Sequence, residues 1–205
     1  MPTARHINSP RNHETEIKLR YERTARSARA MIERRGYKMI EPRTLEADQL
    51  FDRAGELKNT DQLLRLRRAG KLSTITYKGP GERSRHKSRE EIEFDVSDPE
   101  ALTLVLHRLG YHPAFRYEKY RTKFSRSADK GIITIDETPM GIFLEIEGAP
   151  DWIDQTAAHL GYSPEHYVTR SYASLYREYR SAHKRAPQDM IFPLRRPRRT
   201  TGKHT

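Results

Sequence analysis

The chain has 205 residues, no cysteine and a formal net charge of +11 at pH 7. The lack of cysteine excludes a disulfide framework, a thiolate metal site and a cysteine nucleophile. The first residues contain no apolar run like that of a signal peptide, and no segment approaches the roughly 18 apolar residues of a membrane span. We therefore expect a cytoplasmic protein with no membrane partner.

The positive charge is distributed unevenly. From Lys184 onward the chain has seven Lys and Arg and one acid, whereas residues 1–183 hold 32 Lys and Arg against 27 Asp and Glu. Such an acid-rich body differs from proteins that coat nucleic acid with a basic face, so we expect no nucleic-acid partner for it. Residues 1–12 and 184–205 are polar, basic or proline-containing, which predicts flexible ends. The basic tail is either a solubilising terminus or a contact for nucleic acid or acidic lipid.

Near the N-terminus, charged and uncharged residues alternate strictly. Glu14, Glu16 and Lys18 are separated by Thr15 and Ile17. This spacing predicts a β-strand with one charged face and one apolar face. The simplest interpretation is that the charged face meets water.

The same alternation recurs in six later segments, and less regularly over residues 37–52. Each predicted strand carries its charges on one face, and acids and bases are sorted rather than mixed with Ser, Gln and Asn. In chain order, the six segments carry the following residues on the charged face: Arg65 with Arg67; Lys78; Arg89 with Glu91 and Glu93; Lys119 with Arg121 and Lys123; Thr134 with Asp136; and Glu145 with Glu147.

Four amphipathic helices are predicted among the strands. They span about residues 24–35, 97–109, 151–160 and 171–183, where apolar residues recur at helical spacing. The first three end at Gly36, Gly110 and Gly161, as helices commonly do. Their apolar faces are sufficient to cover the apolar faces of the strands.

Two arrangements are compatible with this pattern. In an ordinary antiparallel sheet the charged faces would be solvated. In an α+β fold built on a closed eight-stranded antiparallel β-barrel, the helices would pack outside and the charges would point into a tunnel. Buried like charges repel unless a ligand compensates them. Polyphosphate together with Mg²⁺ or Mn²⁺ would match both the bases and the acids.

An ordered set of motifs resembles the CYTH superfamily, also called triphosphate tunnel metalloenzymes. The motifs are, in the family's order, Glu14-x-Glu16-x-Lys18, Arg65-Leu66-Arg67, Thr76-Tyr77-Lys78-Gly79-Pro80, Arg89-Glu90-Glu91-Ile92-Glu93, Tyr117-Glu118-Lys119-Tyr120-Arg121, Ile135-Asp136-Glu137-Thr138 and Gly141-Ile142-Phe143-Leu144-Glu145-Ile146-Glu147-Gly148. The chain is most similar to the class IV adenylate cyclase-like and thiamine triphosphatase-like bacterial proteins. The resemblance implies an eight-stranded tunnel domain over residues 13–183 that binds triphosphate inside.

The resemblance also implies roles for individual residues. Phosphate oxygens would be bound by Lys18, Arg65, Arg67, Lys78, Arg89, Lys119 and Arg121. Mg²⁺ or Mn²⁺ would be held by Glu14, Glu16, Asp136, Glu145 and Glu147, while Glu91 and Glu93 would hold a second metal or orient the bases. The predicted catalytic group is Glu14, Glu16, Lys18, Lys78 and Arg121.

The implied activity is a metal-dependent reaction on a triphosphate-containing small molecule, namely ATP, inorganic triphosphate or thiamine triphosphate. We expect a class IV adenylate cyclase-like phosphorus–oxygen lyase that converts ATP to cyclic AMP and pyrophosphate. The alternatives are an inorganic or thiamine triphosphatase that releases orthophosphate, and a non-catalytic binder of polyphosphate or nucleic-acid ends. The resemblance permits a homodimer, although no sequence feature requires one.

Overall fold

The computed structural model describes residues 12–127 and 129–193, apart from the side chains of Asn12 and Arg83. The predicted flexible N-terminus, except for Asn12, and the tail from residue 194 lie outside this part of the chain. The strands are β1 (Asn12–Tyr21), β2 (Lys38–Asp52), β3 (Leu63–Ala69), β4 (Leu72–Lys78), β5 (Glu82–Arg83), β6 (Lys87–Asp95), β7 (His112–Ser125), β8 (Ile132–Thr138) and β9 (Gly141–Glu147). The helices are α1 (Ala25–Arg34), α2 (Glu56–Asn59), α3 (Pro99–Arg108), α4 (Pro150–His159), the 3₁₀ turn η1 (Pro164–His166) and α5 (Tyr172–Ala182).

The strands form a closed antiparallel barrel of eight strands. The hydrogen-bonded order is β1-β9-β8-β7-β2-β3-β4-β6, and β6 pairs back with β1 to close the ring. The two-residue β5 pairs with Lys87 and Ser88 at the start of β6. The closed barrel predicted from the sequence is therefore confirmed, and the solvated-sheet alternative is wrong.

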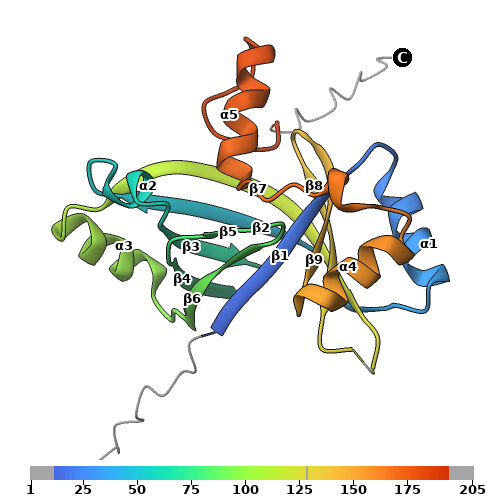
Figure 1. Cartoon of the computed structure of the whole chain (residues 1–205). Coiled ribbons are helices and arrows are strands. Elements are labelled where there is room, and N and C mark those ends of the chain that lie inside the picture. Colours follow the sequence, from blue (N-terminus) through green and yellow to red (C-terminus); the bar gives the residue numbers. More distant parts are fainter. Residues whose placement is uncertain (1–11, 128, 194–205) are drawn as a thin grey trace, which may run out of the picture.

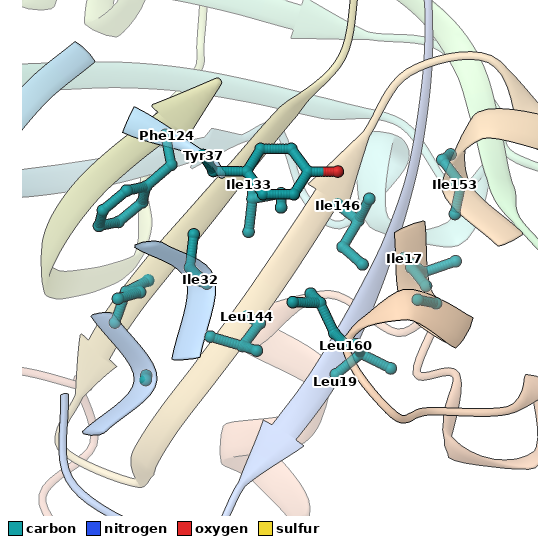
Figure 2. Packing of buried hydrophobic residues seen from close by; sticks show 13 residues of the cluster. Ile17, Leu19, Ile32, Tyr37, Phe124, Ile133, Leu144, Ile146, Ile153 and Leu160 are labelled. Atoms are coloured by element: carbon teal, nitrogen blue, oxygen red, sulfur yellow. The ribbon is translucent and has the colours of Figure 1, made fainter. Parts of the chain in front are cut away.

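The outer face of one half of the barrel is covered by α1 and α4 (Figure 1). Figure 2 shows the resulting apolar cluster, in which Ile17 and Leu19 of β1 pack with Ile32 of α1 and Ile153 of α4. Because strand side chains alternate between faces, the burial of Ile17 on the outside directs Glu16 and Lys18 to the inside. The apolar layer thus determines which side chains line the tunnel.

A second cluster lies under α3, on the outside of β2, β3 and β4. Leu106 of α3 packs there with Leu66 and Ile75. Only part of the predicted apolar face of this helix is buried, since Val105 is 54% exposed and Leu109 is 58% exposed. None of the helices in the described ranges is long and apolar enough to cross a membrane.

The third cluster joins α5 to one end of the barrel (Figure 1). Tyr176 of α5 donates hydrogen bonds to the carbonyls of Pro187 and Asp189, and the fully buried Met190 exchanges backbone hydrogen bonds with β7. In the part of the predicted tail that the structure describes, residues 184–193, it is therefore Asp189, Met190 and Phe192 that contact β7.

Replacement of Met190 by Ala tests this docking. We expect Met190→Ala to lower the free energy of unfolding by about 2–5 kcal/mol, because it leaves a cavity in a buried cluster. The matched control is Met39→Ala, at a methionine that is 40% exposed, which should change stability by less than about 0.5 kcal/mol. Urea denaturation measures both, and equal effects would show that Met190 is not held as described.

Candidate functional site

The interior of the barrel is a charged cavity of about 390 Å³. Its lining holds nine cations and six carboxylates, so it offers partners for both anions and cations. The lining cations are Lys18, Arg65, Arg67, Lys78, Lys87, Arg89, Lys119, Arg121 and Lys123, and the lining carboxylates are Glu14, Glu16, Glu91, Glu93, Glu145 and Glu147. The structure thus brings together every predicted phosphate-binding residue and every predicted metal ligand except Asp136.

Four of the glutamates lie on two neighbouring strands, β1 and β9. Glu16 is opposite Glu147 in the strand register, and Lys18 is opposite Glu145. Carboxylates directly opposite each other on one face repel. Lys18 relieves part of this repulsion, because its Nζ lies 2.8 Å from an oxygen of Glu16 and 3.2 Å from one of Glu145.

The pKa values of these carboxyls show how well each is neutralised. Burial alone would raise the pKa of Glu16, but the ammonium of Lys18 lowers it below its ordinary value. The pKa of Glu145 is also lowered, because nearby cations outweigh the effect of burial. For Glu147, burial and the repulsion of Glu14 and Glu16 raise the pKa to about 7. Glu147 is therefore the least neutralised member of the group.

The donor set fits a divalent cation, although it is not preassembled around one. Within residues 12–127 and 129–193, no three Asp, Glu or His side chains already converge as metal ligands, and Lys and Arg contact several of the carboxylates. Carboxylate oxygens are the donors that Mg²⁺ and Mn²⁺ prefer. A cation beside Glu147 would also remove the like-charge repulsion. The residues that would hold it are Glu14, Glu16, Glu145 and Glu147.

Asp136, which is also predicted to be a metal ligand, lies beside the tunnel cations and not among the residues that line the cavity. It is fully buried, and its Oδ2 accepts hydrogen bonds from Lys119 Nζ and the Tyr172 hydroxyl, each at 2.8 Å. Its Oδ1 accepts a hydrogen bond from Arg121 Nε at 2.7 Å and from the hydroxyl of Thr134 at 3.4 Å. Through these contacts Asp136 orients the two basic side chains, and its role as a metal ligand stays a prediction.

Tyr172, the first residue of α5, is a site residue that the sequence did not identify. Its ring centroid lies 5.4 Å from Lys18 Nζ and 5.2 Å from Lys119 Nζ, within the range of cation–π attraction. The helical spacing over residues 171–183 predicted only that Tyr172 lies on the apolar face of a helix. That spacing gives no sign that the Tyr172 hydroxyl contacts Asp136. Through this residue α5 holds two lysines at its end of the tunnel.

Two acids on β2, Glu46 and Asp48, were also missed. Arg67 binds both, with its Nε 2.8 Å from Asp48 and its Nη1 3.0 Å from Glu46. Burial opposes ionisation of Glu46, but Lys119 and the neighbouring arginines, including Arg65, lower its pKa to about 2. The sequence signal was weak because the polarity of the two faces reverses directly after Asp48, where Gln49 follows Ala47 on one face and Leu50 follows Asp48 on the other.

Glu91 and Glu93 are placed among bases. Lys78 binds Glu14, and its Nζ lies 3.1 Å from Glu91. Arg65 Nη2 lies 3.3 Å from Glu93. Of the two roles predicted for these glutamates, the geometry favours the orientation of basic side chains.

Arg89 and Lys87 lie side by side on the inner face of β6. Arg89 is 6% exposed, and within the described ranges its Nε has no hydrogen-bond partner. Lys87, which was not predicted as a site residue, is the first residue of β6, and its Nζ is 3.4 Å from Glu16. Burial lowers the pKa of Lys87 to about 8. The alternation of Lys87, Arg89, Glu91 and Glu93 is the signal that would have identified it.

Comparison with known proteins gives a consistent result. A family model described as the CYTH domain matches residues 12–172. Among curated proteins, the chain is similar to "Putative adenylate cyclase" from Methanocaldococcus jannaschii, with 28% identity over 116 residues, or 57% of this chain. The match spans about two thirds of that relative's length (66%).

Two solved structures share the fold. A "putative adenylate cyclase" from Vibrio parahaemolyticus superposes with a TM-score of 0.71 at 18% identity, covering 81% of this chain and 98% of the other. A "putative adenylyl cyclase" from Hippeastrum, described as having a dominant triphosphatase activity, has a TM-score of 0.60 at 19% identity and covers 81% and 96%. At these identities the likeness concerns the fold alone.

The raised pKa of Glu147 predicts a specific pH dependence of stability in EDTA. Because the folded protein holds this proton more tightly than the unfolded chain, the Glu147 contribution favours folding at low pH and is lost as pH rises through about 7. Relative to Glu147→Gln, the native protein should therefore lose stability between about pH 5 and pH 8. Urea denaturation across this range measures the difference, and a constant difference would contradict the assignment.

Proposed function

Because the chain belongs to the CYTH family, whose members are metal-dependent triphosphate enzymes, we propose that it is a divalent-metal-dependent enzyme acting on a triphosphate substrate inside the barrel. Within that family we propose the class IV adenylate cyclase-like reaction. The observation that carries the proposal is the juxtaposition, in one closed tunnel, of a glutamate group on β1 and β9 with a large set of Lys and Arg. Simple anion binding would not require the glutamates.

The basic side chains would bind the triphosphate by exchanging their present carboxylate partners for phosphate oxygens. Lys119 and Arg121 are held in place by Asp136, so they are pre-positioned before substrate enters. Arginine binds phosphate oxygens with two parallel hydrogen bonds, which makes Arg65 and Arg67 suitable for orienting the chain of phosphates. Such fixed donors stabilise the charge that develops during phosphoryl chemistry.

A divalent cation held by the glutamates would supply charge neutralisation and activation of the attacking oxygen. In the cyclase reaction the ribose 3′-oxygen forms a bond to the α-phosphorus, the bond from that phosphorus to the β-phosphate oxygen breaks, and pyrophosphate leaves. The hydroxyl proton is released to solvent. Lys18 lies between the glutamates of β1 and β9, where its ammonium would bind the phosphate next to the cation.

A second candidate is hydrolysis, in which water attacks the terminal phosphorus and orthophosphate leaves. We keep this alternative because the Hippeastrum protein, which has the same fold, is described as having a dominant triphosphatase activity. Both reactions need the same charged tunnel, and they differ in which phosphorus faces the attacking oxygen.

Product analysis separates these reactions. The purified protein is incubated with ATP, inorganic triphosphate or thiamine triphosphate, each with Mg²⁺ or Mn²⁺. We expect cyclic AMP and pyrophosphate from ATP, whereas orthophosphate release would support the hydrolase. Absence of turnover with all three, together with binding that is independent of metal, would refute both enzymatic proposals.

Substitution of Glu145 tests the role of the glutamate group. We expect Glu145→Gln to reduce metal-dependent turnover at least about 100-fold, the upper end of the losses found for residues that merely support metal ligands. The control is Glu137→Gln on the same sheet, because Glu137 pairs with Arg43 at an exposed position outside the tunnel. Circular dichroism and thermal unfolding verify the fold of both variants. Retention of the native rate by Glu145→Gln would remove this residue from the proposed metal site.

A further inference from the structure

The ring of strands closes at a seam between β1 and β6. The pairing of these two strands ends at Glu16, which lies opposite Lys87. Further along β1, the neighbour on this side is Val168, whose N–H donates a hydrogen bond of 2.8 Å to Lys18 and whose carbonyl accepts one of 3.0 Å from it. Val168 belongs to the connection between α4 and α5, residues 160–171. A segment from outside the ring of strands therefore completes the wall beside Lys18.

A second connection reaches the same seam. It joins β4 to β6 over residues 79–86 and includes β5. Although connections usually run over the surface, its last residue, His86, is only 6% exposed. His86 directly precedes Lys87, which lines the tunnel. Both connections thus approach the tunnel at the seam.

Asp154 contacts both connections from α4, the helix that covers the outside of the barrel here (Figure 1). Its Oδ1 lies 2.8 Å from His86 Nε2 and accepts a hydrogen bond of 3.0 Å from the Tyr167 hydroxyl. Arg85 contacts its Oδ2. The ring centroids of His86 and Tyr167 lie 6.1 Å apart, within the range of aromatic contacts. We call Asp154, Arg85, His86 and Tyr167 the Asp154 clamp.

Two of the contacts in the clamp are stronger than the third. Burial alone would raise the pKa of Asp154, but the hydrogen bonds from His86 and Tyr167 lower it. Because a carboxylate only accepts hydrogen bonds, the Nε2 of His86 carries a hydrogen, and hydrogen bonds to an ionised acceptor are stronger than neutral ones. The Arg85 side chain is 56% exposed, and an exposed ion pair contributes little. The contacts of His86 and Tyr167 therefore hold the two connections.

The clamp is linked to the tunnel through the chain on both sides. His86 precedes Lys87, whose Nζ lies 3.4 Å from Glu16. Tyr167 precedes the residue that bonds to the backbone of Lys18, and the Lys18 Nζ lies 2.8 Å from the same glutamate. Since consecutive Cα atoms are only about 3.8 Å apart, a displacement of His86 or Tyr167 also displaces its neighbour at the tunnel wall.

We propose that Asp154 is a positioning residue, which fixes the two connections at the seam from outside the barrel and so sets the places of Lys18 and Lys87 around Glu16. The inference rests on the proposed function, in which these lysines are cations that meet the phosphates of the substrate. Asp154 is not among the residues that line the tunnel. It acts on a bound ligand only through His86 and Tyr167.

The first test measures affinity without turnover, by titration calorimetry in EDTA with inorganic triphosphate as the probe. We expect Asp154→Ala to weaken binding by about tenfold and Tyr167→Phe by about threefold, because they remove several hydrogen bonds and one hydrogen bond of the clamp. Asp154→Asn retains an acceptor oxygen for both donors and should weaken binding less than Asp154→Ala. The matched control is Asp151→Ala, which removes an exposed acid one turn earlier on α4 and should bind like the native protein. Circular dichroism verifies the fold of each variant.

The second test is hydrogen exchange of the ligand-free protein, followed by mass spectrometry, and it separates positioning from a local structural role. Tyr167→Phe changes only the connection between α4 and α5. If Asp154 joins the two connections, the same variant should also accelerate exchange over residues 79–89. In the Asp154→Ala background Tyr167→Phe should add nothing, because its partner oxygen is already absent.

Three results would overturn the inference. They are an affinity of Asp154→Ala equal to that of Asp151→Ala, an exchange effect of Tyr167→Phe confined to residues 160–171, and absence of triphosphate binding to the native protein. If Asp154→Ala does not fold, Tyr167→Phe and Asp154→Asn decide the question by the same criteria.

Turnover measurements distinguish this inference from the proposed function. If the native protein turns over none of ATP, inorganic triphosphate and thiamine triphosphate with Mg²⁺ or Mn²⁺, but the affinity and exchange effects occur, the enzymatic proposal fails and the role of Asp154 stands. If the native protein and Asp154→Ala turn over substrate at the same rate and bind inorganic triphosphate equally, the enzymatic proposal stands and the role of Asp154 fails.

Discussion

Charges that point into the closed barrel must be balanced by other charges, because burial removes most of the water that would otherwise solvate them. Lys119, for example, is 2% exposed and lies between Asp136 and Glu46. Buried ion pairs of this kind contribute little net stability. Their value is functional. A ligand that brings both negative charge and a metal cation can offer phosphate oxygens to the bases and the cation to the acids at the same time.

This balance depends on strand register. A shift of one residue in β1 would turn Ile17 inward and Glu16 outward, because adjacent side chains occupy opposite faces. The apolar cluster under α1 and α4 prevents this shift by burying Ile17 and Leu19 completely. The geometry of the charged interior is therefore determined by the hydrophobic packing on the opposite face of the same strands.

Much of the fold and tunnel could be predicted, because period-two alternation reports directly on the two faces of a regular strand. The prediction failed where alternation was broken or where contacts came from another element. In β2 the change of polarity at Gln49 and Leu50 concealed Glu46 and Asp48. Tyr172 belongs to a helix whose spacing reports only its apolar face. The contacts by which Asp136 orients Lys119 and Arg121 are likewise visible only in the structure. The cavity between α2, α5 and the end of the barrel depends on how these helices meet the strands, which strand patterns do not describe.

The closure of the barrel has a consequence for the order of folding. β1 is the first strand of the chain, yet its partners are β6 and β9, with Glu16 opposite Lys87 on one side and Glu147 on the other. During synthesis β1 must remain without its second partner until the ninth strand has emerged from the ribosome. Such distant pairing is slow and leaves strand edges exposed in the meantime. The strand that completes the barrel is thus also the strand that carries Glu14, Glu16 and Lys18, so this charged group forms only when folding is nearly complete.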